Sequence, residues 1–170
     1  MQESVAVTKE NIFTQPHANV YNLINNRTNV PDPNDSTGKR KFVYVKEPNF
    51  MAVNFAGFPC ISVSQDDYSQ GDKVASATKA KVIDTIQIIV MTQDKKGDSS
   101  GDPSGAAQLD EISNNIIKTL NNLTNSASLR NNGLKNKQFT SAKFDWGELD
   151  GKAIFKREFS LRFSQLRVIA

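Results

Sequence analysis

The chain has very few of the side chains on which catalytic and metal sites depend. Its 170 residues include one cysteine and one histidine. A single cysteine forms no disulfide within the chain, which predicts a reducing compartment. A zinc site takes three or four Cys, His or carboxylate ligands, and a catalytic triad needs a histidine to activate its nucleophile. We therefore expect no metal, no cofactor and no enzymatic activity.

Long apolar runs and phosphate-binding glycine patterns are also missing. No apolar stretch approaches the roughly 18 residues that cross a bilayer. The start, MQESVAVTKENIF, has neither the basic nor the apolar segment of a signal peptide. No P-loop or dinucleotide-binding pattern occurs. The sequence predicts a soluble protein that binds neither a membrane nor a nucleotide cofactor.

Residues 93–104 contain two patterns that imitate functional motifs. GDSSG, residues 97–101, fits the G-x-S-x-G pattern of α/β-hydrolases, but their histidine follows the serine, whereas His17 precedes it. Ser99 thus has no base, and Ser99→Ala should change nothing in an esterase or protease screen. Asp94, Asp98 and Asp102 recur every four residues, but an EF-hand needs a denser ladder ending in Glu. We interpret the segment as a solvated loop.

Two segments carry helix signals. Pro16 suits a first helical turn, and Val20, Leu23 and Ile24 share one face of a helix that stops near residue 25. A second helix spans residues 105–123, capped by Asp102 or Ser104 and ending before Gly133. Its apolar stripe has spacings of three and four residues and comprises Leu109, Ile112, Ile116, Leu120 and Leu123.

The strand signals lie between and after these helices. Residues 42–45 and 50–55 read as short strands, and Gly57 opens a loop that leads into a strand up to residue 63. Residues 64–81 are an exposed loop or a long hairpin tip. Residues 82–92 form the strongest strand, with Ile86, Ile88 and Val90 on one face. Asp150-Gly151 predicts a turn between strands 138–146 and 152–168.

The order of these elements predicts an α+β fold, with a two-layer domain and a mostly antiparallel sheet covered on one face by two helices. In the last strand the apolar residues Phe155, Phe159, Leu161 and Phe163 alternate with polar ones, so we expect the second sheet face to be polar. Residues 1–13 form a polar N-terminal arm, and residues 14–170 form the single domain. We expect Cys60 in the core, Trp146 packed on the sheet, and His17 on a helix surface or boundary.

Charge is divided unevenly along a chain of net charge +3. Residues 64–112 contain nine Asp or Glu and five Lys or Arg, and residues 130–170 contain four and nine. Opposite charges on two patches set the orientation of a head-to-tail contact. The candidate interface residues are Asp66, Asp67, Asp72, Asp94, Asp98, Asp102, Lys152, Lys156, Arg157 and Arg162. We read the basic run 39–41 as a solvated or interface surface.

The layout resembles one known family. A GFPCISV strand entry at 57–63 is followed by VIDTIQIIVMT, a Gly/Ser/Asp loop, the helix AAQLDEISNNIIKTLNNL and a closing strand GKAIFKREFSLRF. Over residues 14–168 this order resembles the tail terminator, or tail completion, proteins of long-tailed phages.

The resemblance implies a structural function. Such proteins form a ring, usually a hexamer, on the head-proximal end of the tail tube, where they end tube growth and join the tail to the neck. The implied partners are the chain itself, the tail tube protein, a neck or head-completion protein, and the sheath if the tail is contractile. Genomic DNA passes through the ring without specific binding. The implied location is the tail-neck junction of the virion, after assembly in the host cytoplasm.

An alternative stays open. The Lys and Arg residues of 152–167 lie mainly on the polar side of the last strand, where they could contact phosphates. The alternative function is a basic nucleic-acid-binding module.

Overall fold

The structure is a computed structural model that describes residues 15–73, 79–94, 104–131 and 134–168. For residues 15–16, 66–73, 79–82 and 165–168 it describes the backbone alone. The elements are α1 (Gln15–Asn25), β1 (Val43–Tyr44), β2 (Cys60–Lys73), β3 (Lys79–Gln93), α2 (Ser104–Asn121), α3 (Leu123–Asn131), β4 (Gln138–Leu149) and β5 (Lys152–Val168).

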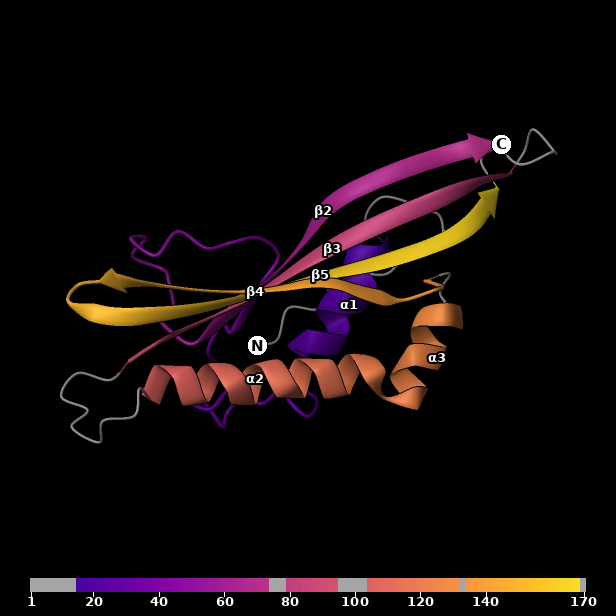
Figure 1. The fold of residues 1–170 in the computed structure, drawn as a ribbon. Coiled ribbons are helices and arrows are strands. Elements are labelled where there is room, and N and C mark those ends of the chain that lie inside the picture. Colours follow the sequence, from indigo (N-terminus) through magenta and orange to yellow (C-terminus); the bar gives the residue numbers. More distant parts are fainter. Residues whose placement is uncertain (1–14, 74–78, 95–103, 132–133, 169–170) are drawn as a thin grey trace.

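The strands form one open sheet in the order β1-β2-β3-β5-β4 (Figure 1). All neighbouring strands are antiparallel except β1, which runs parallel to β2. The predicted α+β class and mostly antiparallel sheet are confirmed. The 64–81 segment is a long hairpin rather than a loop, because β2 continues to Lys73 and β3 begins at Lys79.

The helices pack on one face of this sheet, which we call the helix face. Leu109, Ile112, Ile116 and Leu120 of α2 are buried in the same core as Ile86, Ile88, Phe159 and Leu161 of the sheet. Val20, Tyr21 and Ile24 of α1 join that core. Apolar side chains at helical spacing thus meet apolar side chains at strand spacing, as the sequence predicts.

The predicted helix 105–123 is wrong at its C-terminal end. The chain leaves α2 at Asn122, whose Oδ1 accepts hydrogen bonds from the N–H groups of Thr124 at 2.9 Å and Asn125 at 3.3 Å. An asparagine in this position caps a new helix, which is α3. Leu123 is therefore turned out of the apolar stripe and is 88 % exposed, while Leu129 of α3 enters the core.

The N-terminus of α2 is held by the sheet. The Asp94 carboxylate, just after β3, accepts a hydrogen bond from the Gly105 N–H at 2.7 Å. Thr92 donates its hydroxyl to the Gly105 carbonyl at 2.6 Å. A Cβ at Gly105 would lie 2.9 Å from the Phe155 ring, so a glycine permits this close approach. Asp102, one of the two predicted caps, lies outside the described residues, and Ser104 is the first helical residue.

The sequence analysis expected the opposite sheet face to be polar, but part of this face is apolar and covered. Residues 45–59 fold over it in turns, so the predicted strand 50–55 is wrong. The reason is aromatic packing: Phe50, Phe55 and Phe58 contact one another at ring distances of 5.3 Å and cover Cys60, Ile89 and Met91. We call this the loop face. Cys60 is a core thiol, as expected, and burial raises its pKa to about 12.

The C-terminal hairpin has the predicted turn. Asp150 and Gly151 have φ angles of 53° and 72°, which a two-residue hairpin turn of type I′ requires. Leu149 therefore pairs with Lys152, and β4 continues three residues beyond its predicted end. This turn fixes the register of β4 and thus decides which of its residues share a face with the core.

Candidate assembly surface

Strand β4 is the edge of the sheet and is exposed along most of its length. Of its residues, only Ser141 and Leu149 are even partly buried. Among the described elements, α2 packs on β3 and β5 and does not reach β4 (Figure 1). The strand thus extends past the layer of helices, and its two faces are both accessible.

Three aromatic residues of β4 lie on the helix face beyond the cover of α2. Phe139, Phe144 and Trp146 pair across the strands with Leu161, Arg157 and Phe155. Cross-strand partners share a face, so these side chains form one row, which we call the aromatic strip. Phe144 stacks on Phe155 and Phe139 meets Phe159 edge-on, both at 6.4 Å between ring centroids.

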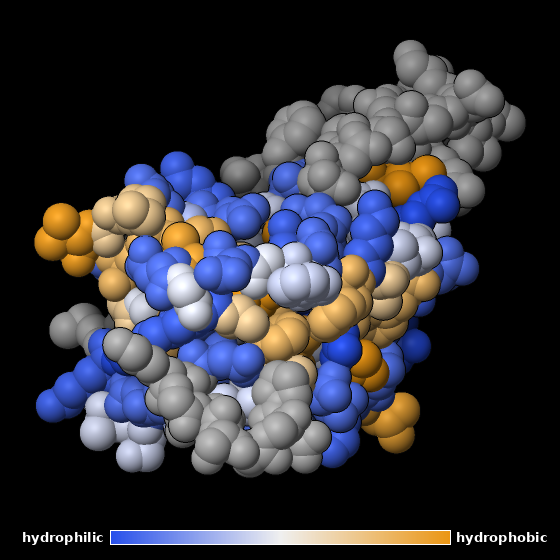
Figure 2. All heavy atoms as spheres, turned by 60° about the vertical axis from the view of Figure 1, so that its left-hand side comes forward, coloured by the Kyte–Doolittle hydropathy of each residue, from blue (hydrophilic) through white to orange (hydrophobic). Residues whose placement is uncertain are grey.

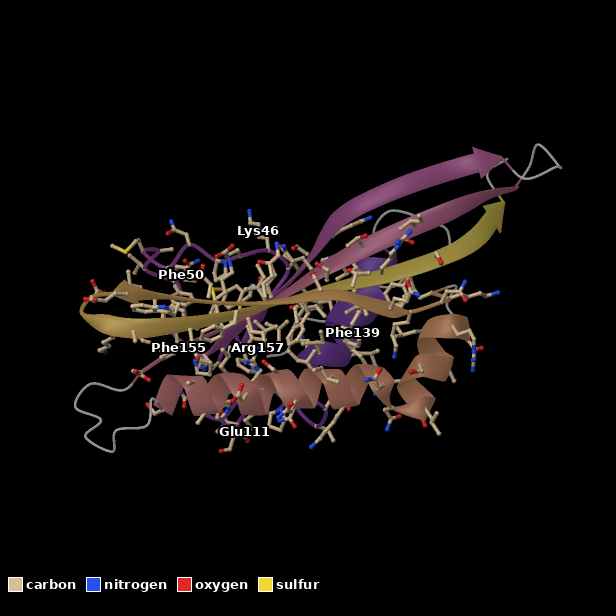
Figure 3. All side chains as sticks on the ribbon, in the orientation of Figure 1. Lys46, Phe50, Glu111, Phe139, Phe155 and Arg157 are labelled. Atoms are coloured by element: carbon tan, nitrogen blue, oxygen red, sulfur yellow. The ribbon has the colours of Figure 1, made fainter. Side chains whose placement is uncertain are left out.

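The aromatic strip is largely accessible despite these contacts. Phe144 is 57 % exposed and Trp146 is 68 % exposed. The expectation that Trp146 packs on the sheet is therefore wrong for most of its surface, because no described element lies outside β4. Figure 3 shows Phe139, Phe155 and Arg157 on the side of α2, with Phe50 and Lys46 on the opposite side of the sheet.

The backbone of β4 has an unpaired outer edge. Because Leu149 and Lys152 flank a two-residue turn, hydrogen-bonded pairs alternate from there, and residues 142, 144, 146 and 148 direct their N–H and C=O groups outward. The Trp146 N–H fits this pattern, since it donates to the Asp145 carboxylate at 2.8 Å rather than to β5. The other outward groups have no partner within the described residues.

The opposite edge of the sheet is only partly covered. The two-residue strand β1 pairs with Ile61 and Ser62 of β2. Beyond these residues β2 continues to Lys73 with β3 on one side and no described strand on the other. Free strand edges are templates for pairing with another chain, and proteins usually shorten or cover them.

A pocket lies on the loop face where β4 meets residues 47–50. It has a volume of about 300 Å³. Phe50, Met91, Leu149 and Ile154 contribute apolar surface, and Glu47, Asp145, Glu148 and Lys156 bring charge to its lining. Met51 and Val53 of the same segment are also exposed. In the space-filling view hydrophobic and hydrophilic residues are interspersed over this end of the molecule (Figure 2).

The predicted basic interface residues on β5 have different surroundings. Lys152 adjoins the turn, and Lys156 and Arg162 lie on the loop face, where Lys156 lines the pocket. Arg157 lies on the helix face and forms an ion pair of 2.7 Å with Asp110 of α2. Arg157 therefore already ties the helix to the sheet within one subunit.

The predicted acidic residues are separated from one another. Asp66, Asp67 and Asp72 belong to β2, on its outer half. Asp94 caps α2 at the other end of the sheet. Asp98 and Asp102 lie outside the described residues, as does Ser99. The structure thus places the three β2 residues on a free edge and gives Asp94 a role inside the fold.

Arg40 is a structural residue that the sequence analysis missed. Its Nε and Nη2 atoms donate to the two carboxylate oxygens of Asp32 at 2.7 and 2.9 Å. Nη1 and Nη2 also donate to the carbonyls of Gly57 and Pro59 at 2.8 and 2.7 Å. The reading of 39–41 as a solvated or interface surface is wrong for Arg40, since it holds the chain from 32 to 59 together. The only signal of this contact in the sequence was that Asp32 and Arg40 carry opposite charges.

The single histidine of the chain, His17, contacts the sheet. His17 directs Nε2 to the Val63 carbonyl at 2.5 Å; because a carbonyl only accepts, that nitrogen is the donor. Within the described ranges no three His, Cys, Asp or Glu side chains gather as metal ligands do. No described helix has the length and apolar character to span a membrane. The surface features that stand out are the two free edges and the aromatic strip.

Comparison with known proteins adds no family. No protein-family model matches the chain, and a search of curated proteins finds no significant relative.

Proposed function

We propose that this protein is a structural assembly subunit that forms a ring with copies of itself. The observation that carries the proposal is the aromatic β4 edge, which lies outside the core of an open sheet. Large aromatic groups in a row on an unpaired strand are typical of association surfaces. The second free edge, on β2, differs from the first, and two different patches give the head-to-tail contacts from which rings close.

Among ring-forming proteins, the tail terminators of long-tailed phages are the best candidates. The support is the resemblance in sequence layout, together with an α+β architecture whose element order agrees with it. In this proposal the ring caps the head-proximal end of the tail tube, ends tube growth and joins the tail to the neck. Its partners are the tail tube protein, a neck or head-completion protein and, in a contractile tail, the sheath.

The proposal predicts two results with purified protein. Mass photometry over a range of concentrations should reveal one discrete oligomer, and electron microscopy should show it as a ring. Mixed with growing tubes of its tail tube protein, the protein should bind one end and stop elongation. A protein that stays monomeric at all concentrations and leaves the tubes unchanged in length would contradict the proposal.

The nucleic-acid alternative has weaker support from the arrangement of charge. Lys143, Lys156 and Arg162 share the loop face, but Asp145 and Glu158 lie between them in the cross-strand pairs. Phosphate contacts would give an affinity for DNA that falls steeply with salt, roughly in proportion to the number of contacts. Titration of a DNA duplex at several salt concentrations separates the two functions, because a ring protein without specific DNA binding should show little affinity near physiological salt.

A further inference from the structure

We propose that the outer edge of β4 in one copy pairs in antiparallel fashion with the outer edge of β2, residues 64–73, in the next copy. This inference rests on the proposed ring and names the surface that closes it. The occupant of the β4 edge is thus a defined segment of a second copy of this chain, and the aromatic strip becomes part of the contact.

The first argument is the position of the two edges. In the order β1-β2-β3-β5-β4, the outer half of β2 and the whole of β4 lie on opposite sides of one sheet. Each has one paired side and one side without a strand partner in the described part of the chain. Joining one edge to the other satisfies both rows of backbone groups and leaves the same two edges free on the dimer. Repetition of that step gives a ring when the rotation closes.

The second argument is strand direction. β2 is antiparallel to β3, β3 to β5, and β5 to β4. β2 and β4 therefore run in opposite directions within one subunit. Adding the next copy to the sheet keeps this alternation of directions, so β4 meets the β2 strand of the next copy antiparallel. The registers set residues 138–145 of β4 level with residues 60–67 of β2, so the next copy is displaced along the strands by about five residues, which a ring allows when its strands are inclined to its axis, as in a barrel. Antiparallel ladders are slightly more stable per residue than parallel ones.

The third argument is charge. The outer half of β2 contains Asp66, Asp67 and Asp72, whereas the middle of β4 contains Lys143, an exposed residue. A register with Lys143 opposite Asp67 pairs residues 138–146 of β4 with residues 64–72 of the next copy. Opposite charges facing each other across strands favour this register, and like charges would oppose it. A two-fold contact of β4 with itself, centred on Phe144, would also set Lys143 opposite Asp145, so charge alone does not separate the two arrangements and cross-linking has to do so.

The fourth argument is the shape of the strands. Both edges contain bulges: between Phe139 and Ser141 in β4, and between Gln65 and Asp67 in β2. A bulge bends its strand and increases the local twist, which a sheet that curves into a ring requires. The new strand would lie directly beside Phe144 and Trp146 and reduce their exposure to water.

A proline at residue 142 tests the pairing without disturbing the fold. The Ala142 N–H points outward, so Ala142→Pro removes no hydrogen bond to β5, yet it blocks a strand added outside. The matched control is Ala142→Val, which keeps the N–H and suits a strand. The expected result is a proline variant that melts like the valine variant but no longer forms the oligomer. An oligomer of unchanged size and affinity in the proline variant would overturn the inference.

Charge exchange tests the same contact if the proline variant fails to fold. Lys143→Asp and Asp67→Lys should each weaken association about tenfold, because each brings like charges together. The double variant restores the opposite pair and should associate within about threefold of the original chain. If the double variant associates no more strongly than the single variants, the proposed register is excluded.

Cross-linking distinguishes the head-to-tail contact from a two-fold one. In a Cys60→Ala background, Lys143→Cys together with Asp67→Cys should give a ladder of covalent species up to the full ring on oxidation. Covalent dimers from Lys143→Cys alone would mean that β4 pairs with β4 and would overturn the inference. Rings that persist with the proline variant leave the proposed function standing without this contact, whereas the absence of any oligomer in the unmodified chain contradicts the function itself.

Discussion

The centre of the sheet and its β4 edge are built from similar residues but have opposite surroundings. At the centre, Ile88 and Ile89 of β3 are both buried, one on each face. At the edge, Phe144 and Trp146 are more than half exposed. The comparison teaches that apolar content alone does not decide burial: position in the strand order does. The helices and the 45–59 segment bury the central strands, whereas the helices do not reach β4 and most of that strand stays exposed.

The largest expected effect belongs to the covered centre. Ile116 is fully buried between α2 and the sheet. Ile116→Asp loses about 1.5–3 kcal/mol of apolar burial and adds the several kcal/mol needed to bury a charge, against a total stability of about 5–15 kcal/mol. We expect an unfolded or insoluble protein. The control is Asn114→Asp, an exposed position on the same helix.

Alkylation of Cys60 measures this effect directly. In the folded chain the thiol is buried and its raised pKa, about 12, keeps it protonated at pH 8, so it should react slowly. Ile116→Asp should expose the thiol and speed the reaction, while Asn114→Asp should not. Equal melting temperatures and equal alkylation rates for Ile116→Asp and the unchanged chain would show that the α2 stripe is not the core contact.

An intermediate effect is expected at the loop that covers the opposite face. The Asp32 carboxylate is fully buried and depends on Arg40, with Arg27 farther away at 3.8 Å. Arg40→Met leaves a buried charge without its main partner and frees the carbonyls of Gly57 and Pro59, which we expect to reduce the free energy of unfolding by about 3 kcal/mol. Urea denaturation measures it.

Lys39→Met is the matched control, because Lys39 is exposed and adjoins Arg40. Its effect should stay within about 0.5 kcal/mol. If both variants unfolded at the same urea concentration, Arg40 would have no special part in holding the loop.

The smallest effect on folding is expected at the edge. Trp146→Gln removes an exposed ring, so the free energy of unfolding of the monomer should change by less than about 0.5–1 kcal/mol. Association should weaken strongly in the same variant, because aromatic residues dominate interface energies. Thermal denaturation at low concentration and mass photometry at high concentration separate the two quantities. A variant that loses fold stability but associates normally would reverse the comparison between centre and edge.

Local patterns in the sequence predicted much of the fold. The α2 stripe from Leu109 to Leu120, the alternation in β3 and β5, and the Asp150-Gly151 turn depend on helical and strand periods and on turn chemistry, which neighbouring residues set by themselves. The same logic failed at residues 50–55, where alternating apolar residues predicted a strand. There, contacts among Phe50, Phe55 and Phe58 determine the conformation, and periodicity does not encode them.

The candidate surface was predictable only in part. The charge division pointed to Asp66, Asp67 and Asp72, which the structure places on the free half of β2. It also pointed to Arg157 and Asp94, which instead make contacts within the subunit. Arg157 forms an ion pair with Asp110, and Asp94 accepts a hydrogen bond from the N-terminus of α2. The spacing of Phe144 and Trp146 is the same for an exposed strip as for a buried one. Phe139, five residues before Phe144, joins their face only through the bulge between Phe139 and Ser141, which the sequence did not reveal.

By itself, the sequence determined the class of fold, the α2 stripe, the C-terminal hairpin and the division of charge, because each depends on residues that are close together along the chain. Only the tertiary structure decided which strand lies at the edge and which arginines already form ion pairs within the subunit. It also decided that Asp94, and not a residue next to the helix, accepts the hydrogen bond from Gly105. These features join residues that are far apart in sequence. Their geometry depends on strand order and packing, and no local pattern specifies either.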